Sequence, residues 1–176
     1  GTTAYIFIAS LAAFPLAKHQ FPGRNAFSKI VIWAILFRTE VTGVVVYIIL
    51  AWLGMINTYW SMLLPALASS FGVFLMQQFI VSFPDTILEA ARIDGAGNTR
   101  IFFRIVMPLS KSAWLTLILF SFQGLWNKGA NPAIQSEKLK TLSYAISQIS
   151  SAGLARAGVA AAATVVMMIL PIFVFI

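Results

Sequence analysis

Long apolar runs alternate with short polar stretches along the chain. Apolar residues dominate five segments: Thr2–Ala17, Ile30–Leu53, Ser61–Val81, Ser112–Trp126 and Gly158–Ile176. The second and third reach the ~20 residues that one helical crossing of a bilayer requires. The segments lack the two-residue alternation of barrel strands, and in lipid only helices and closed barrels satisfy their own backbone groups. The pattern predicts an all-α, polytopic transmembrane helical bundle with about five spans, forming a single domain over residues 1–176.

One long polar stretch, residues 82–111, interrupts these apolar segments. It holds three of the five acidic residues and four of the twelve basic ones. Ser82 fits the hydroxyl cap of a helix that carries Asp85 in its first turn. Gly95-Ala96-Gly97 ends this helix, because Gly tolerates the left-handed geometry of a helix end, and a second helix is expected over Asn98–Val106. The stretch therefore predicts a compact helix, glycine turn and helix rather than a loose tether.

Four residues of the first predicted helix share one face because they are spaced three and four apart: Ile87, Ala90, Ala91 and Asp94. A face with alanines at its centre fits deep into a groove on another protein. The same face also suits packing against the helices of the membrane domain itself. The residue pattern leaves both interpretations open.

Composition supports the membrane assignment. The chain is 60% hydrophobic and 10% charged, with a mean hydropathy of +0.89, whereas soluble domains carry about 25% charged residues. The net charge of +7 sits in loops between apolar runs, which indicates membrane topology and lipid headgroups rather than a nucleic-acid partner. The absence of Cys and the single His exclude disulfides, thiolate metal sites and His clusters.

The distribution of basic residues orients the predicted spans. Residues 18–29 and 82–111 lie on one side of the membrane by parity, and together they carry seven Lys and Arg residues. The opposite loop, 127–157, carries four. The positive-inside rule places 18–29 and 82–111 in the cytoplasm.

The polar stretch also carries a specific spacing. Glu89-Ala90-Ala91 is followed after three residues by Gly95, after nine more by Ile105, and then by Met107-Pro108. This resembles the EAA loop of ABC importer permeases, which reads Glu-Ala-Ala, three residues, Gly, nine residues, Ile, one residue, Leu-Pro. Met107 for Leu is the only departure and conserves volume.

Further stretches resemble the carbohydrate-importer branch, of the maltose-transporter permease type. They are Phe21-Pro22-Gly23-Arg24, Leu53-Gly54-Met55-Ile56-Asn57-Thr58-Tyr59 and Trp126-Asn127. The resemblance implies a multi-pass subunit of a bacterial or archaeal cytoplasmic membrane. It also implies a core of six helices, so we expect the chain to be a fragment without the first helix and the natural C-terminus.

The resemblance implies that 82–111 is a coupling loop seated in a cleft of a cytoplasmic ATPase dimer. The docking residues would be Glu89, Ala90, Ala91, Asp94, Gly95, Ile105 and Pro108. The other implied partners are a second, homologous permease, an extracytoplasmic solute-binding protein, membrane lipid and a carbohydrate substrate. Gly95-Ala96-Gly97 lacks the spacing of an ATP-binding loop. We therefore expect no catalytic residue, cofactor or metal in this chain, which is a conduit rather than the hydrolase.

Two charges, Arg38 and Glu40, lie within the second apolar segment. A charge near the middle of a bilayer costs about 2.5–3.5 kcal/mol on insertion scales. Two residues apart on a helix, they do not face each other. They are candidates for the substrate path, or for ion pairs that hold two permease subunits together. Asn127 is a further substrate-path candidate, with an ordinary solvated loop as the alternative.

A structural membrane protein is disfavoured because it has no need for residues 82–111, and two other rival functions remain. One is an ABC permease for another solute, such as a polyol, glycerol phosphate or an acidic saccharide. The other is a transporter or channel subunit that works without ATP. Dependence on an ATPase partner through residues 82–111 separates the second rival from the ABC interpretation.

Overall fold

The structure, a computed structural model, describes residues 1–37, 39–128, 133–134, 136, 139–151 and 157–175. Within these residues every regular element is helical, which confirms the all-α class. The contacts divide the chain into two compact units. The first joins Gly1–Thr39 to Leu67–Ile118, and the second joins Glu40–Ala66 to Leu119–Ile176. The expectation of a single domain stays a prediction.

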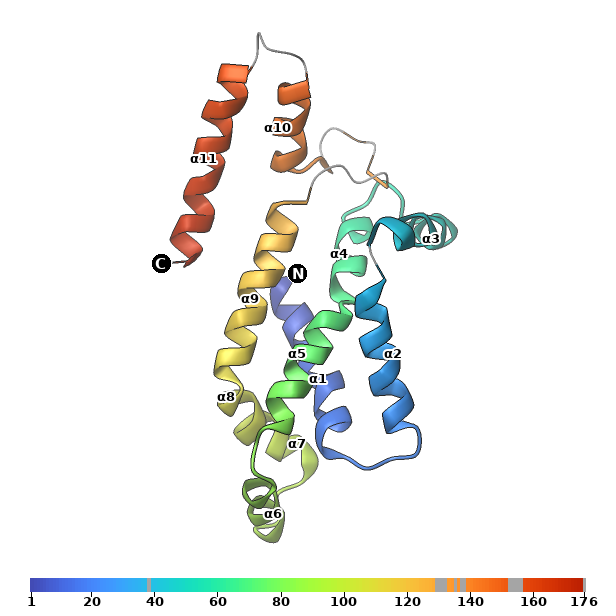
Figure 1. The fold of residues 1–176 in the computed structure, drawn as a ribbon, viewed down its shortest axis with the longest axis vertical. Coiled ribbons are helices and arrows are strands. Elements are labelled where there is room, and N and C mark those ends of the chain that lie inside the picture. Colours follow the sequence, from blue (N-terminus) through green and yellow to red (C-terminus); the bar gives the residue numbers. More distant parts are fainter. Residues whose placement is uncertain (38, 129–132, 135, 137–138, 152–156, 176) are drawn as a thin grey trace. The chain divides into compact units, whose positions relative to one another are not determined.

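The first unit is built around the parallel pair α1 (Thr2–Lys18) and α5 (Ser70–Val81), which lie alongside each other (Figure 1). Helix α2 (Arg24–Leu36) also packs against α5, where Gln77 Nε2 donates a hydrogen bond to Ser28 Oγ at 3.0 Å. Pro15 lies inside α1 rather than at its end. The predicted first segment is thus confirmed almost to the residue.

The α1–α5 contact depends on small side chains, as expected from the small residues grouped near the start of α5. A Cβ atom on Gly72 would lie 2.2 Å from the Tyr5 hydroxyl oxygen. Tyr5 is buried, and its hydroxyl donates to Ser69 Oγ at 3.4 Å. Small residues let membrane helices approach closely, because helix contacts there depend on packing rather than on a hydrophobic drive. Gly72 is therefore a position where α1 and α5 approach too closely for any larger side chain.

Not every predicted span is one helix. The second apolar segment, Ile30–Leu53, was predicted to be continuous, and this is wrong. The structure has α2, an extended Phe37 (ψ 120°) and then α3 (Thr39–Trp52). The sequence of this segment carries two charges, Arg38 and Glu40, which an unbroken helix would hold in the middle of an apolar run.

Few of the described helices are both long enough and apolar enough to cross a membrane. Among the described residues, Trp60–Val81, which contains α4 (Trp60–Leu67) and α5, is one stretch long and apolar enough to cross a membrane. Asn98–Leu109 and α9 (Lys111–Trp126), bent by 74°, make a second if they count as one span. The other apolar helices are shorter: Thr2–Lys18, Thr42–Trp52 and Gly158–Phe173.

The polar stretch forms the predicted helix, turn and helix. Helix α6 (Asp85–Ile93) is followed by α7 (Asn98–Ile101), a π-helical turn η1 (Phe102–Val106) and α8 (Met107–Leu109). The predicted Ser82 cap is wrong. Ser82 Oγ donates to the Phe79 carbonyl at 2.6 Å, so it serves the end of α5, and Pro84 precedes α6. The expected acid in the first turn, Asp85, is confirmed.

The second unit contains α3, α4, the end of α9, α10 (Leu142–Ser151) and α11 (Ala157–Phe175). Helix α10 was not predicted. The signal was present in the sequence: Leu142, Ala145, Ile146 and Ile149 recur at helical spacing. Thr141 caps the helix, because the Tyr144 N–H donates to Thr141 Oγ1 at 3.3 Å.

Candidate functional site

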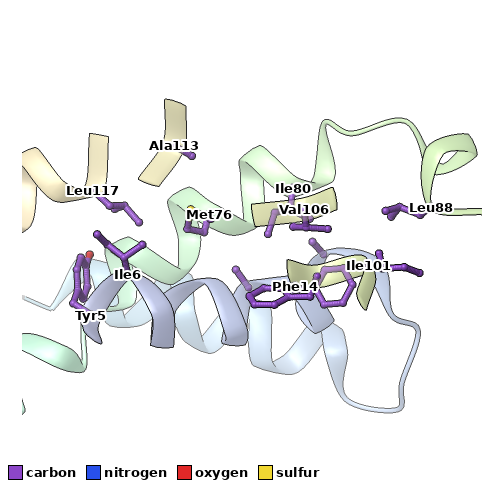
Figure 2. Packing of buried hydrophobic residues seen from close by; sticks show 13 residues of the cluster. Tyr5, Ile6, Phe14, Met76, Ile80, Leu88, Ile101, Val106, Ala113 and Leu117 are labelled. Atoms are coloured by element: carbon purple, nitrogen blue, oxygen red, sulfur yellow. The ribbon is translucent and has the colours of Figure 1, made fainter. Parts of the chain in front are cut away.

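Helix α6 is fixed to the first unit through one side. Leu88 is only 3% exposed and belongs to a cluster with Ile80, Ile101, Phe102 and Val106. Figure 2 shows this cluster, to which α1, α5, α6 and the 98–106 segment all contribute. Ala91 and Ala96 are half-buried and pack against it. Helix α6 is therefore packed against its own unit through its inner side and does not project freely into solvent.

The outer side of α6 is exposed although it is partly apolar. Ile93 is 86% exposed and Ile87 42%, and Glu89 and Ala90 are also exposed. We call Ile87, Glu89, Ala90 and Ile93 the docking face. An exposed apolar helix face of this kind is typical of a helix that lies in a groove of a partner.

The structure separates the two alanines that the sequence placed on one face. Ala90 is exposed, whereas Ala91 already contacts the core of its own unit. Successive helix residues differ by about 100° around the axis, which is enough to turn one outward and the other inward. The packing interpretation is confirmed for Ala91, and the docking roles of both alanines stay predictions.

The predicted glycine turn ends α6. Gly95 has φ +77°, in the left-handed region. Its N–H donates to the Arg92 carbonyl at 3.0 Å, and the Ala96 N–H donates to the Ala91 carbonyl at 2.9 Å. These two bonds satisfy carbonyls that the end of a helix leaves free. Asp94, next to the turn, is exposed.

We expect Gly95→Ala to destabilise the protein solely through the backbone. A Cβ there meets nothing within 4 Å, but a left-handed residue with a Cβ costs about 1–2 kcal/mol. Each kcal/mol should lower the midpoint of thermal unfolding in detergent by about 2–4 °C. Gly97→Ala is the matched control, since Gly97 has open space and a φ of −69° that alanine adopts freely. Equal midpoints for the two variants would contradict the role of the turn.

The last two predicted docking residues, Ile105 and Pro108, lie in the segment that leads from α7 to α9. Ile105, in η1, is half-buried against the core, and Pro108, in α8, is exposed. Trp114 Nε1 donates to the Met107 carbonyl at 3.1 Å across the bend into α9. Ile105 thus stabilises the site from within, and its docking role and that of Pro108 stay predictions.

A basic residue from a distant part of the chain completes the site. Lys18 Nζ lies 2.7 Å from Asp85 Oδ1 and donates to the Phe83 carbonyl at 2.7 Å. The Lys18 hydrogen bond and charge, with a smaller contribution from Arg92, hold the pKa of Asp85 below its ordinary value of 3.8. The contact also places 18–29 and 82–111 at the same end of the unit, as parity predicted. The sequence offered no signal for this pair, whose members lie 67 positions apart.

Among the substrate-path candidates, the structure describes the surroundings of Asn127 alone. Arg38 lies outside the described residues, and so does the side chain of Glu40 in α3. Asn127 is exposed just after α9, and its N–H donates to the Gln123 carbonyl at 2.9 Å. Burial lowers the pKa of the neighbouring Lys128. The substrate roles of Arg38, Glu40 and Asn127 stay predictions.

The chain matches known proteins over most of its length. Residues 5–176 match the model of a family described as "Binding-protein-dependent transport system inner membrane component". Protein LplC of Bacillus subtilis is 35% identical over 127 residues, which are 72% of this chain and 42% of that protein. The sn-glycerol-3-phosphate transport system permease protein UgpE of Yersinia enterocolitica is 37% identical over 127 residues, 72% of this chain and 45% of that one.

A third relative is named for a polysaccharide. The polygalacturonan/rhamnogalacturonan transport system permease protein YtcP of Bacillus subtilis is 32% identical over 127 residues, covering 72% of this chain and 44% of that protein. The chain thus spans less than half the length of the curated relatives it matches.

A solved structure shares the fold. It is the crystal structure of a bacterial ABC transporter involved in the import of the acidic polysaccharide alginate. One of its chains superimposes with a TM-score of 0.80 at 23% identity, covering 98% of this chain and 66% of that one. At this identity the likeness concerns the fold.

Proposed function

The chain belongs to the family of binding-protein-dependent transport system inner membrane components, and on that basis we propose that it is the transmembrane subunit of an ATP-driven ABC importer for a carbohydrate. Membership confirms the family that the spacing from Glu89 to Pro108 indicated. In this proposal the chain pairs with a second permease and receives solute from an extracytoplasmic binding protein. A separate ATPase supplies the energy, and residues 82–111 connect to it.

The main support for coupling to an ATPase is the exposure of the docking face of α6. Its Ile93 is 86% exposed, at the end of a helix whose inner residue Leu88 is 3% exposed. Burying apolar surface yields about 25 cal/mol per Å², so a protein cleft that covers this face gains affinity. Helix α6 is packed against its own unit through Leu88 and exposes Ile87 and Ile93 on the other side. Such a helix is suited to transmit a movement of the ATPase cleft to the permease.

The proposed solute is an oligosaccharide, and an anionic solute is the second candidate. Two relatives carry the names of a glycerol phosphate and a galacturonan transport system, and galacturonan is a polymer of an acidic sugar. Arg38 is the residue we propose would meet an anionic group, because a guanidinium binds carboxylates and phosphates in bidentate fashion. The alternative proposal for Arg38 is an ion pair between the two permeases.

Reconstitution tests this function directly. The native permease is placed in liposomes with its pairing permease, its ATPase and its binding protein. Uptake of glycerol 3-phosphate, an oligogalacturonide and a malto-oligosaccharide is then measured with and without ATP. We expect ATP-dependent uptake of one saccharide. ATP-dependent uptake of glycerol 3-phosphate alone would overturn the carbohydrate assignment, and uptake without the ATPase would overturn the ABC mechanism.

A further inference from the structure

The Lys18 side chain lies at the junction of three helices. Its side chain is only 6% exposed, although it ends an apolar helix. Its ammonium group contacts three oxygens: Asp85 Oδ1 at 2.7 Å, the Phe83 carbonyl at 2.7 Å and the Val81 carbonyl at 3.5 Å. An ammonium has three donors, so these contacts use its full capacity.

Each of these oxygens belongs to a different part of the α5–α6 corner. Val81 ends α5, whose last carbonyls lack partners within the helix and attract a cation. Asp85 begins α6, where an anion is favoured by the helix dipole. Phe83 lies in the short connection between them. One charge on α1 therefore fixes the direction in which α6 leaves α5.

The corner has a second attachment point, which makes it rigid. Leu88 of α6 packs in the buried cluster that contains Phe14 and Ala17 of α1. Asp85, which Lys18 contacts, and Leu88 lie at different places along α6, and two separated attachments prevent a helix from pivoting about either one. The end of α1 is itself held, because Arg24 donates to the Leu16 carbonyl at 2.8 Å and to the Ala17 carbonyl at 3.0 Å.

We propose that Lys18 is a positioning residue that locks α6 to the end of α1, so that the docking helix and α1 move as one body when the ATPase moves. This inference rests on the proposed function, because it takes the ATPase as the source of the movement. Without Lys18, α6 keeps its docking face and its Leu88 contact but turns about Leu88. The ATPase then moves α6 without moving α1 to the same extent.

Distances between spin labels on α1 and α6 test this inference. The chain has no Cys, so labels are attached after Leu11→Cys on α1, where the residue is 43% exposed, and Arg92→Cys on α6, away from the docking face. The distance is measured in the full reconstituted complex, without nucleotide and with ADP and vanadate. We expect one unchanged distance with Lys18 present. In Lys18→Met the distance should shift by at least about 2 Å on trapping, the size of a small helix displacement.

Asp85→Asn and Lys29→Met define the specificity of the effect. Asp85→Asn removes only the ionic contact to α6 and should produce a smaller shift than Lys18→Met. Lys29→Met removes an exposed cation of α2 in the same unit and should produce none. Lys18→Arg retains the charge and should restore the unchanged distance, which a general loss of packing at this position would not allow.

Two results would overturn the inference. One is a Lys18→Met complex whose label distance stays the same in both states, and the other is a nucleotide-dependent shift with Lys18 present. Failure of the proposed function looks different, because the ATPase would then not associate with the permease and vanadate would trap no nucleotide.

Discussion

Ala90→Asp should strongly weaken binding of the proposed ATPase while leaving the fold of the permease intact. Ala90 is exposed at the centre of the docking face, so an aspartate there disturbs no contact within the chain. In a closely fitting apolar cleft the same carboxylate loses its hydration without gaining a partner. The loss should reach at least about 2 kcal/mol, the level of an interface hot spot, or about 30-fold in affinity. Co-purification and titration of the ATPase measure it.

Two further variants isolate the cause of this loss. Asn25→Asp adds the same charge at an exposed position in the first turn of α2, outside the docking face, and should bind the ATPase normally. Ala91→Asp alters the neighbouring alanine, which packs against the core, so it should lower the midpoint of thermal unfolding, whereas Ala90→Asp should not. Wild-type affinity for Ala90→Asp would show that the ATPase binds elsewhere.

Gly72→Ala should weaken the packing of α1 against α5. The added Cβ would lie 2.2 Å from the hydroxyl oxygen and 2.6 Å from Cζ of Tyr5, well inside van der Waals contact. Tyr5 is only 5% exposed, so it has little room to move away. Overpacking of this kind costs about 1–3 kcal/mol, and each kcal/mol lowers the midpoint of thermal unfolding by about 2–4 °C.

A double-mutant cycle checks that the clash is the cause. Tyr5→Ala removes the atoms that the new Cβ meets, so the double variant should lose less stability than the sum of the two single losses. Gly124→Ala is the matched control, because this glycine also lies within a helix but has no atom near its missing Cβ. It should be neutral or slightly stabilising, since alanine favours a helix more than glycine does. Additive losses at Tyr5 and Gly72 would contradict the close approach.

Much of the fold was predictable because apolar length and turn chemistry are local. The first segment, the helix over 85–93 and the left-handed Gly95 follow from residues next to each other in the chain. The sequence also held a signal for the break between α2 and α3, namely two charges within an apolar run. The prediction relied instead on the length of the run, which is enough for one crossing. Helix α10 was missed because polar residues outnumber the apolar ones that define its face.

The site could be predicted only in part. Spacing identified Glu89, Ala90 and Gly95, but it could not decide which of two adjacent alanines turns outward. That choice depends on where Leu88 meets the core, which is a matter of tertiary packing. The Lys18–Asp85 contact depends on the parallel pairing of α1 with α5. Residues so far apart in sequence carry no spacing rule that would connect them.

The parallel pairing of α1 and α5 also sets the order of events while the chain is being made. Lys18 and Val81 are 63 positions apart, and at about 5–20 residues per second a ribosome needs about 3–13 s to add that many. Until then α1 has no α5 to pack against, and the Lys18 side chain at its end remains hydrated or binds lipid phosphates. A basic side chain at this position favours the membrane surface for the end of α1 until α5 is made. We therefore expect the residue that joins three helices in the folded chain to hold the end of α1 at the membrane surface before α5 is made.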